Sequence, residues 1–172
     1  MSQTRGATVE AERIRQSIFR VLSVIQASQE YPTLHSAESQ AVKPTPLYAL
    51  ITEHAEPQLV EGLLLIAVAL RVHNERHGRK LFDNAGDVGY LNETTRSSLS
   101  MKDACDKIIH ADDLRLGGGT KPWEVKEFDR QLPGPYVIAT AHLRGINRRK
   151  PWKADLDIWA FCEAATRLTQ HL

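Results

Sequence analysis

The first half of the chain carries two stretches in which apolar residues recur every three or four positions, the spacing of one helical face. The first stretch predicts a helix from Thr8, an N-cap residue type, to about Ser28, after a flexible tail over residues 1–7. The second predicts a helix from Pro57 to Gly78, a C-cap glycine. Apolar residues cover most of its circumference, which is typical of the central helix of a bundle.

Prolines, glycines and short polar residues predict irregular segments between the helices. Residues 29–46 hold three prolines and predict a loop, and a short helix is expected over residues 47–54. Residues 79–98 and 116–122 are rich in Gly, Asn and Asp, so both are expected to form loops or turns. The triple glycine at 117–119 lacks the spacing and the strand–helix context of a phosphate-binding loop.

One β-hairpin is predicted near the C-terminus. Tyr136–Leu143 is rich in β-branched and aromatic residues and predicts a strand. Gly145–Asn147 predicts the turn, and Arg148–Lys153 a short return strand whose Pro151 suits an edge position. An amphipathic helix then begins near Asp155.

These elements predict a mainly α fold, a four- to five-helix bundle with one small β-hairpin before the C-terminal helix. The 172 residues, 42% hydrophobic and 25% charged, suit a single domain over residues 1–172. Lys and Arg number 22 against 21 Asp and Glu, so there is no broad basic field. The N-terminus lacks an apolar signal segment and Leu63–Leu70 is too short to span a membrane, so a cytoplasmic protein without membrane contact is expected.

The segment after Leu99 joins an apolar helix to a titratable group. Ser100 has the residue type of an N-cap, and Asp103 follows it at capping-box spacing. His110 comes directly after the apolar stripe, near the helix C-terminus and among carboxylates. The apolar stripe consists of Met101, Ala104, Cys105, Ile108 and Ile109. The carboxylates around His110 are those of Asp106, Asp112 and Asp113.

The run from Cys105 to His110 resembles the signature helix of HEPN-type proteins. These are small helical bundles, many of them metal-independent ribonucleases of toxin–antitoxin and antiviral systems. The signature is an Arg, a polar residue, a few mostly apolar residues and a His; Asp106 and His110 match, whereas Cys105 replaces the Arg. The resemblance implies an RNA-engaging homodimer without a cofactor, in which His110 transfers protons and Asp106 orients it. A cysteine cannot supply the fixed positive charge, so either the protein is an inactive relative or Arg71 or Arg76 supplies that charge.

The predicted hairpin gathers cations around an aromatic residue. Such a set suits contacts with nucleic-acid phosphates and bases. Its members are Arg144, Arg148, Arg149, Lys150 and Trp152, with Lys153 beside them. The alternative is a solvated hairpin whose Trp152 packs on the bundle.

The histidines also allow other interpretations. His110 can instead stabilise the helix dipole and bond Asp106 or Asp113. His73 and His77 are spaced for one metal ion but have no third ligand, so no metal site is predicted. The competing function is a non-catalytic helical module that binds a protein partner. An open groove holding His110, Asp106 and an Arg favours the RNA hypothesis, and a buried His110 favours the module.

Overall fold

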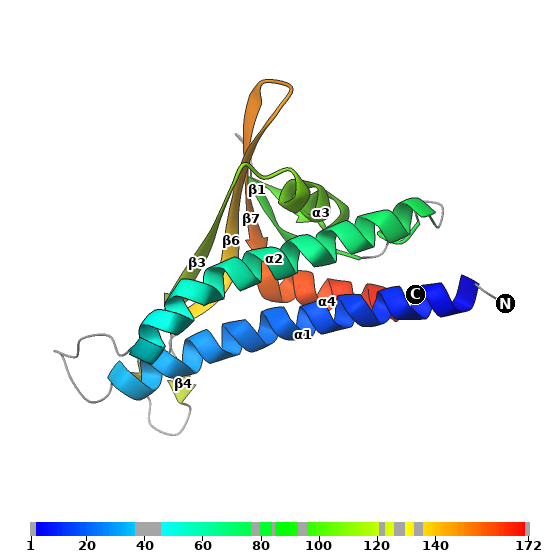
Figure 1. Ribbon diagram of the computed structural model, residues 1–172. Coiled ribbons are helices and arrows are strands. Elements are labelled where there is room, and N and C mark those ends of the chain that lie inside the picture. Colours follow the sequence, from blue (N-terminus) through cyan, green and yellow to red (C-terminus); the bar gives the residue numbers. More distant parts are fainter. Residues whose placement is uncertain are drawn as a thin grey trace.

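The chain combines a pair of long helices with an antiparallel sheet. α1 (Gln3–Ser36) and α2 (Pro46–Arg76) run antiparallel along one side of the molecule (Figure 1). α3 (Met101–Ile109) packs on α2, and α4 (Ile158–Thr169) packs on α1. The computed structural model describes residues 3–36, 46–76, 80–83, 85–92, 96–120, 123–125, 130–132 and 136–170.

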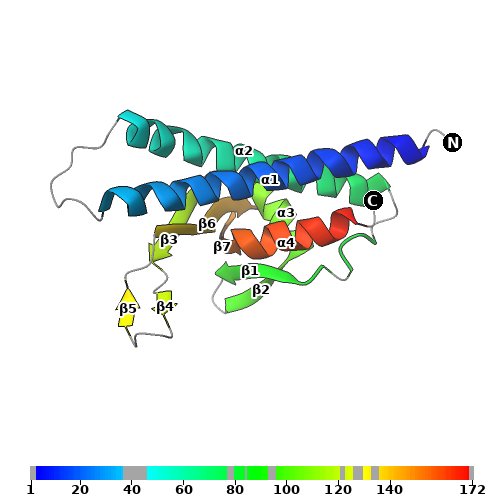
Figure 2. The same ribbon diagram turned by 90° about the horizontal axis from the view of Figure 1, so that it is seen from below.

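The sheet overturns the predicted fold class, because the chain has an α+β fold and not a mainly α bundle with one hairpin. A five-stranded antiparallel sheet has the order β2-β1-β7-β6-β3. A separate two-stranded ribbon, β4–β5, lies beyond β3 (Figure 2). The strands are β1 (Asp87–Asn92), β2 (Arg96–Ser100), β3 (Asp113–Thr120), β4 (Trp123–Val125), β5 (Arg130–Leu132), β6 (Tyr136–Asn147) and β7 (Lys150–Asp157).

Two predicted loops were wrong because their residues are held by strand pairing. Residues 79–98 include β1 and the start of β2, and residues 116–122 include the end of β3 up to Thr120. Glycines 117–119 have low strand propensity, but they pair with β6 across a register shift between Gly117 and Gly118. Hydrogen bonding to a neighbour distant in sequence therefore overrides the local turn signal.

Prolines misled the predicted helix boundaries. α1 starts at Gln3 and includes Pro32, so most of the predicted tail and part of the predicted loop are helical. α2 starts at Pro46 and continues through Pro57, which merges two predicted helices. Pro57 is exposed, so water can reach the carbonyl that its missing N–H leaves without a partner. Residues 37–45 and the predicted C-cap Gly78 lie outside the described residues.

The hairpin was predicted, but with its turn in the wrong place. Gly145–Asn147 belongs to β6, and the turn is Arg148–Arg149. β7 lies inside the sheet, yet β1 pairs only with its Ala154–Leu156 portion. At Pro151, β7 therefore pairs with β6 alone, which is the edge environment that a residue without an N–H requires.

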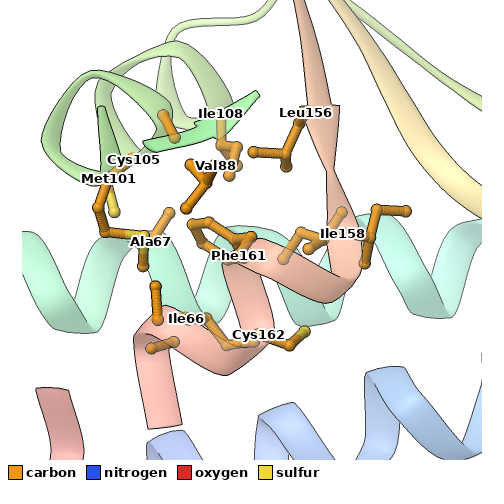
Figure 3. Packing of buried hydrophobic residues seen from close by; sticks show 14 of the residues in the cluster. Ile66, Ala67, Val88, Met101, Cys105, Ile108, Leu156, Ile158, Phe161 and Cys162 are labelled. Atoms are coloured by element: carbon orange, nitrogen blue, oxygen red, sulfur yellow. The ribbon is translucent and has the colours of Figure 1, made fainter. Parts of the chain in front are cut away.

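The core lies where the helices meet the inner face of the sheet (Figure 3). Phe161 of α4 is buried among side chains of α2, α3, β1 and β7. The helix predicted after Leu99 is confirmed as α3: the Ser100 hydroxyl accepts the Asp103 N–H at 3.2 Å and also lies 2.7 Å from the Asp103 carboxylate. Its apolar stripe is buried at Met101, Ala104, Cys105 and Ile108, and its fifth predicted member, Ile109, is half-buried. Within the described residues, the helices include none long and apolar enough to cross a membrane.

Candidate functional site

A pocket of about 790 Å³ opens at the C-terminal end of α3. α2 contributes one wall, α3 and the segment after it a second, and the far end of the β6–β7 hairpin a third. The side chains that matter for its chemistry are Arg71, Asp103, Asp106, Lys107, His110, Asp112 and Trp152. The fold therefore brings Asp106 and His110 together with an arginine from the neighbouring helix.

Arg71 occupies the pocket because it follows Leu70, the last apolar residue of the buried α2 stripe. Its Nε lies 2.9 Å from Oδ1 of Asp106, and its Nη2 lies 3.4 Å from Oε1 of Glu75. The Arg71 and Asp106 side chains are 24% and 36% exposed, so water screens this pair and its contribution to stability is below about 1 kcal/mol. A guanidinium has five N–H donors, and these contacts leave donors for a ligand in the pocket.

His110 is the C-cap of α3, with its backbone N–H donated to the Asp106 carbonyl at 3.1 Å. Its side chain is exposed and lines the pocket. The chain beyond it is fixed to β6, since the Asp112 N–H donates to the Arg144 carbonyl at 2.9 Å. The side chain of His110 is therefore in the open placement and not in the buried one.

Trp152 forms a wall of the pocket from the inner face of β7. It is 5% exposed, and the Lys107 ammonium lies 4.1 Å from the centroid of its ring. A Cβ at Gly145 would come within 2.4 Å of this ring and 2.9 Å of the His110 carbonyl, so only glycine fits there. Gly145, which signalled a turn in the sequence, instead allows Trp152 and the end of α3 to approach β6.

The remaining predicted nucleic-acid residues lie on the hairpin. Arg144, Arg148, Arg149 and Lys150 are all exposed. Arg148 and Arg149 form the two-residue turn with φ of 47° and 67°. This left-handed pair of angles normally selects Asn-Gly, and each non-glycine residue held there costs roughly 1–2 kcal/mol. The turn therefore costs stability, and it leaves two guanidinium groups exposed at the end of the hairpin.

Charge is distributed unevenly between the pocket and the hairpin. Three carboxylates, of Asp103, Asp106 and Asp112, line the pocket together with the two cations Arg71 and Lys107. The carboxylates thus outnumber the cations in the pocket, where Arg71 is one of the two positive charges, whereas the hairpin carries exposed cations.

The other candidate residues lie away from the pocket chemistry. Nη1 of Arg76 lies 3.8 Å from Oε2 of Glu10 on α1. Nδ1 of the buried His73 lies 3.8 Å from the same carboxylate oxygen. His77 is outside the described residues. Across the part of the chain that is described, side chains of His, Cys, Asp and Glu form no group of three suited to a metal ion.

The two cysteines are free thiols buried among apolar residues. Burial raises the pKa of the Cys162 thiol from 9.0 to about 12, with the charge of Asp157 adding to the effect. Burial also raises the pKa of Cys105, and the neighbouring Asp106 raises it further. A protonated, buried Cys105 cannot act as a nucleophile at neutral pH.

The sequence interpretation missed polar residues on the outer face of the sheet. His142 and Asp155 face each other there at 2.7 Å, beside Arg115. Arg115 comes directly before residues 116–122, which were predicted to form a loop. No strand was therefore expected to place Arg115 beside His142. The signal was the alternation of polar and apolar residues around His142 and Asp155, which places both on one face of a hairpin.

Protein-family models, curated proteins and solved structures were each compared with the chain, and none of the three comparisons finds a match. The likeness to the HEPN signature therefore rests on the Cys105–His110 segment alone. The five-stranded sheet departs from the helical bundle that this likeness implied.

Proposed function

We propose that this protein binds RNA and cleaves it without a metal ion, at the pocket formed by Arg71, Asp106 and His110. The observation that carries the proposal is the 2.9 Å pair between Arg71 and Asp106 in the same open pocket as His110. Arg71 replaces, from the adjacent helix, the positive charge that Cys105 lacks. The hairpin cations beside the pocket supply attraction for phosphates.

The chemistry follows from the residue types. Neutral His110 accepts the proton of a ribose 2′-hydroxyl as that oxygen attacks the adjacent phosphorus. The bond to the 5′-oxygen breaks, that oxygen takes a proton from water, and a 2′,3′-cyclic phosphate remains. Arg71 stabilises the negative charge that grows on the phosphoryl oxygens. Asp106 holds the guanidinium of Arg71 in place.

The test is cleavage of mixed single-stranded RNA in excess EDTA by the wild type, His110→Ala and Arg71→Ala. Matched controls are His54→Ala and Arg20→Ala, because both positions are exposed and outside the pocket. The proposal expects cyclic-phosphate products, a loss of roughly 100-fold or more in each pocket variant, and unchanged controls. Full activity in His110→Ala, or no cleavage by the wild type, would overturn the catalytic assignment.

A second candidate, a protein-binding module, is favoured by the outer face of α1 and α2. Phe19, Leu65 and Val68 are 74%, 49% and 41% exposed there. Apolar exposure on paired helices is typical of contact with another helical surface, and a second copy of this chain would give the homodimer that the HEPN resemblance implies. Light scattering tests this: a dimer mass that falls to the monomer in Val68→Glu supports it, and a monomeric wild type contradicts it.

A further inference from the structure

The outer face of the sheet carries one continuous row of polar side chains across all five strands. Strand register aligns Ser98 with Tyr90, Tyr90 with Asp155, Asp155 with His142, and His142 with Arg115. Helices α1, α3 and α4 pack on strands of this sheet from the inner side, where the buried residues lie (Figure 1). Four of the five residues in the row are exposed, and Asp155 is half-buried.

At the centre of this row, the His142 ring is held in place by Asp155 and lies close to Gly117. Nδ1 of His142 lies 2.7 Å from Oδ1 of Asp155, so the carboxylate favours the tautomer with its proton on Nδ1. The ring lies over Gly117 of β3, where a Cβ would come within 2.3 Å of Nε2. A side chain at position 117 would displace the imidazole, which explains a glycine in the middle of a paired strand.

Positive charge gathers on one side of the row, toward the hairpin turn. Arg115 pairs with Asp113 at 3.0 Å, and the next row places Arg144 beside Lys153. Arg144, Lys153 and the turn residues Arg148, Arg149 and Lys150 form no ion pair with the carboxylates of the described residues. Their unbalanced charge runs from the middle of the outer face to the tip of the hairpin.

We propose that this outer face binds single-stranded RNA and leads it to the pocket, an inference that rests on the proposed function. Exposed Tyr90 and Ile146, together with the His142 ring, offer surfaces on which unpaired bases stack, and the cations take the phosphates. The outer face is continuous with the pocket because Ile146 and Asn147, at the end of β6, line the pocket.

A single strand fits this face better than a duplex. From Tyr90 on β1 to Arg115 on β3 the row crosses three strand spacings, about 14 Å. Recognition of duplex RNA by shape takes phosphate contacts over roughly 16 base pairs, a far longer span. Stacking on rings also requires bases that are free of a partner strand.

The experiment measures fluorescence anisotropy of a labelled RNA of about ten nucleotides, within the roughly 4–16 of known single-strand sites. The variants are Arg144→Glu with Lys153→Glu, and Tyr90→Ala. The control is Lys80→Glu with Lys102→Glu, which makes the same charge change at two exposed positions outside the sheet face and the pocket. We expect the sheet pair to weaken binding at least 10-fold, Tyr90→Ala to weaken it about 5-fold or more, and the control to bind almost as the wild type.

The outcomes separate this inference from the proposed function. If wild type cleaves RNA and all variants bind it equally well, the sheet assignment is wrong and the pocket assignment stands. If wild type binds as expected but does not cleave, the face is supported and the catalytic assignment fails. Equal affinity for a duplex of the same sequence overturns the choice of a single strand, and absence of any RNA binding overturns both proposals.

Discussion

The two faces of the β6–β7 hairpin obey different constraints. On the inner face, Leu143, Trp152 and Leu156 are buried against the helices, and each side chain is limited by the volume around it. On the outer face, His142 and Lys153 are exposed, and charge and hydrogen bonding decide what they do. Alternation along the same two strands thus separates the residues that hold the fold from those that we assign to binding.

The largest expected difference between the faces is in stability. Leu156→Ala leaves a cavity in a fully buried site and should lower the free energy of unfolding by about 2–5 kcal/mol. Lys153→Ala on the same strand should change it by less than about 0.5 kcal/mol. Urea denaturation of both variants measures the contrast, and similar midpoints would contradict the assignment of the two faces.

Beneath the inner face, the core should also carry a pH dependence through its thiols. A raised pKa means that the folded state keeps the proton of Cys162 when the unfolded state releases it. The free energy of unfolding is therefore unaffected by this group well below pH 9 and falls above it, by roughly 1 kcal/mol at pH 10. Cys105 should act in the same direction. Replacing both cysteines by alanine should reduce the difference in the free energy of unfolding between pH 8 and pH 10. If that difference is unchanged, the thiols titrate alike in the folded and unfolded states.

Gly145 connects the inner face to the pocket, so its substitution should affect both. In Gly145→Ala the new methyl group collides with Trp152 and with the His110 carbonyl, and we expect a loss of about 1–3 kcal/mol in stability. Tryptophan fluorescence should shift as the ring of Trp152 moves, and RNA cleavage should fall with the displacement of His110. A variant with wild-type stability and fluorescence would show that the contact is easily relieved.

The turn should respond with opposite signs in stability and in binding. Changing Arg148→Asn together with Arg149→Gly supplies the residues that the left-handed turn favours, and should raise the free energy of unfolding by about 1–2 kcal/mol. The same change removes two exposed cations and should weaken RNA binding. Thermal unfolding and anisotropy on one preparation measure both quantities; a loss of stability, or binding equal to that of the wild type, would mean that the arginines have no such role.

Local signals predicted the parts of this protein whose structure is local. α3 follows from Ser100, Asp103 and the apolar stripe behind them, because a cap and a helical face lie within a few residues. β3 could not be predicted in this way, since its glycines are extended only through their pairing with β6. Arg115 joins the outer-face row only through that pairing, so the sequence did not indicate that it lies beside His142.

The pocket was predictable in part. Asp106 and His110 came from one short motif, and Arg71 was one of two arginines expected to complete it. Its contact with Asp106 depends on how α2 and α3 pack, which no spacing along the chain fixes. Arg76, the other arginine, lies near Glu10 of α1, because it points from a different side of α2.

The most direct test of the RNA assignment is the salt dependence of binding to single-stranded RNA. Each phosphate contact contributes a slope of about −0.7 to the logarithm of the association constant against the logarithm of salt concentration. If Arg144, Arg148, Arg149, Lys150 and Lys153 all contact phosphates, the slope for wild type should approach roughly −3.5. Arg144→Glu with Lys153→Glu should make it shallower by more than one. Binding that is insensitive to salt, or no binding at low salt, would contradict RNA as the ligand of the hairpin.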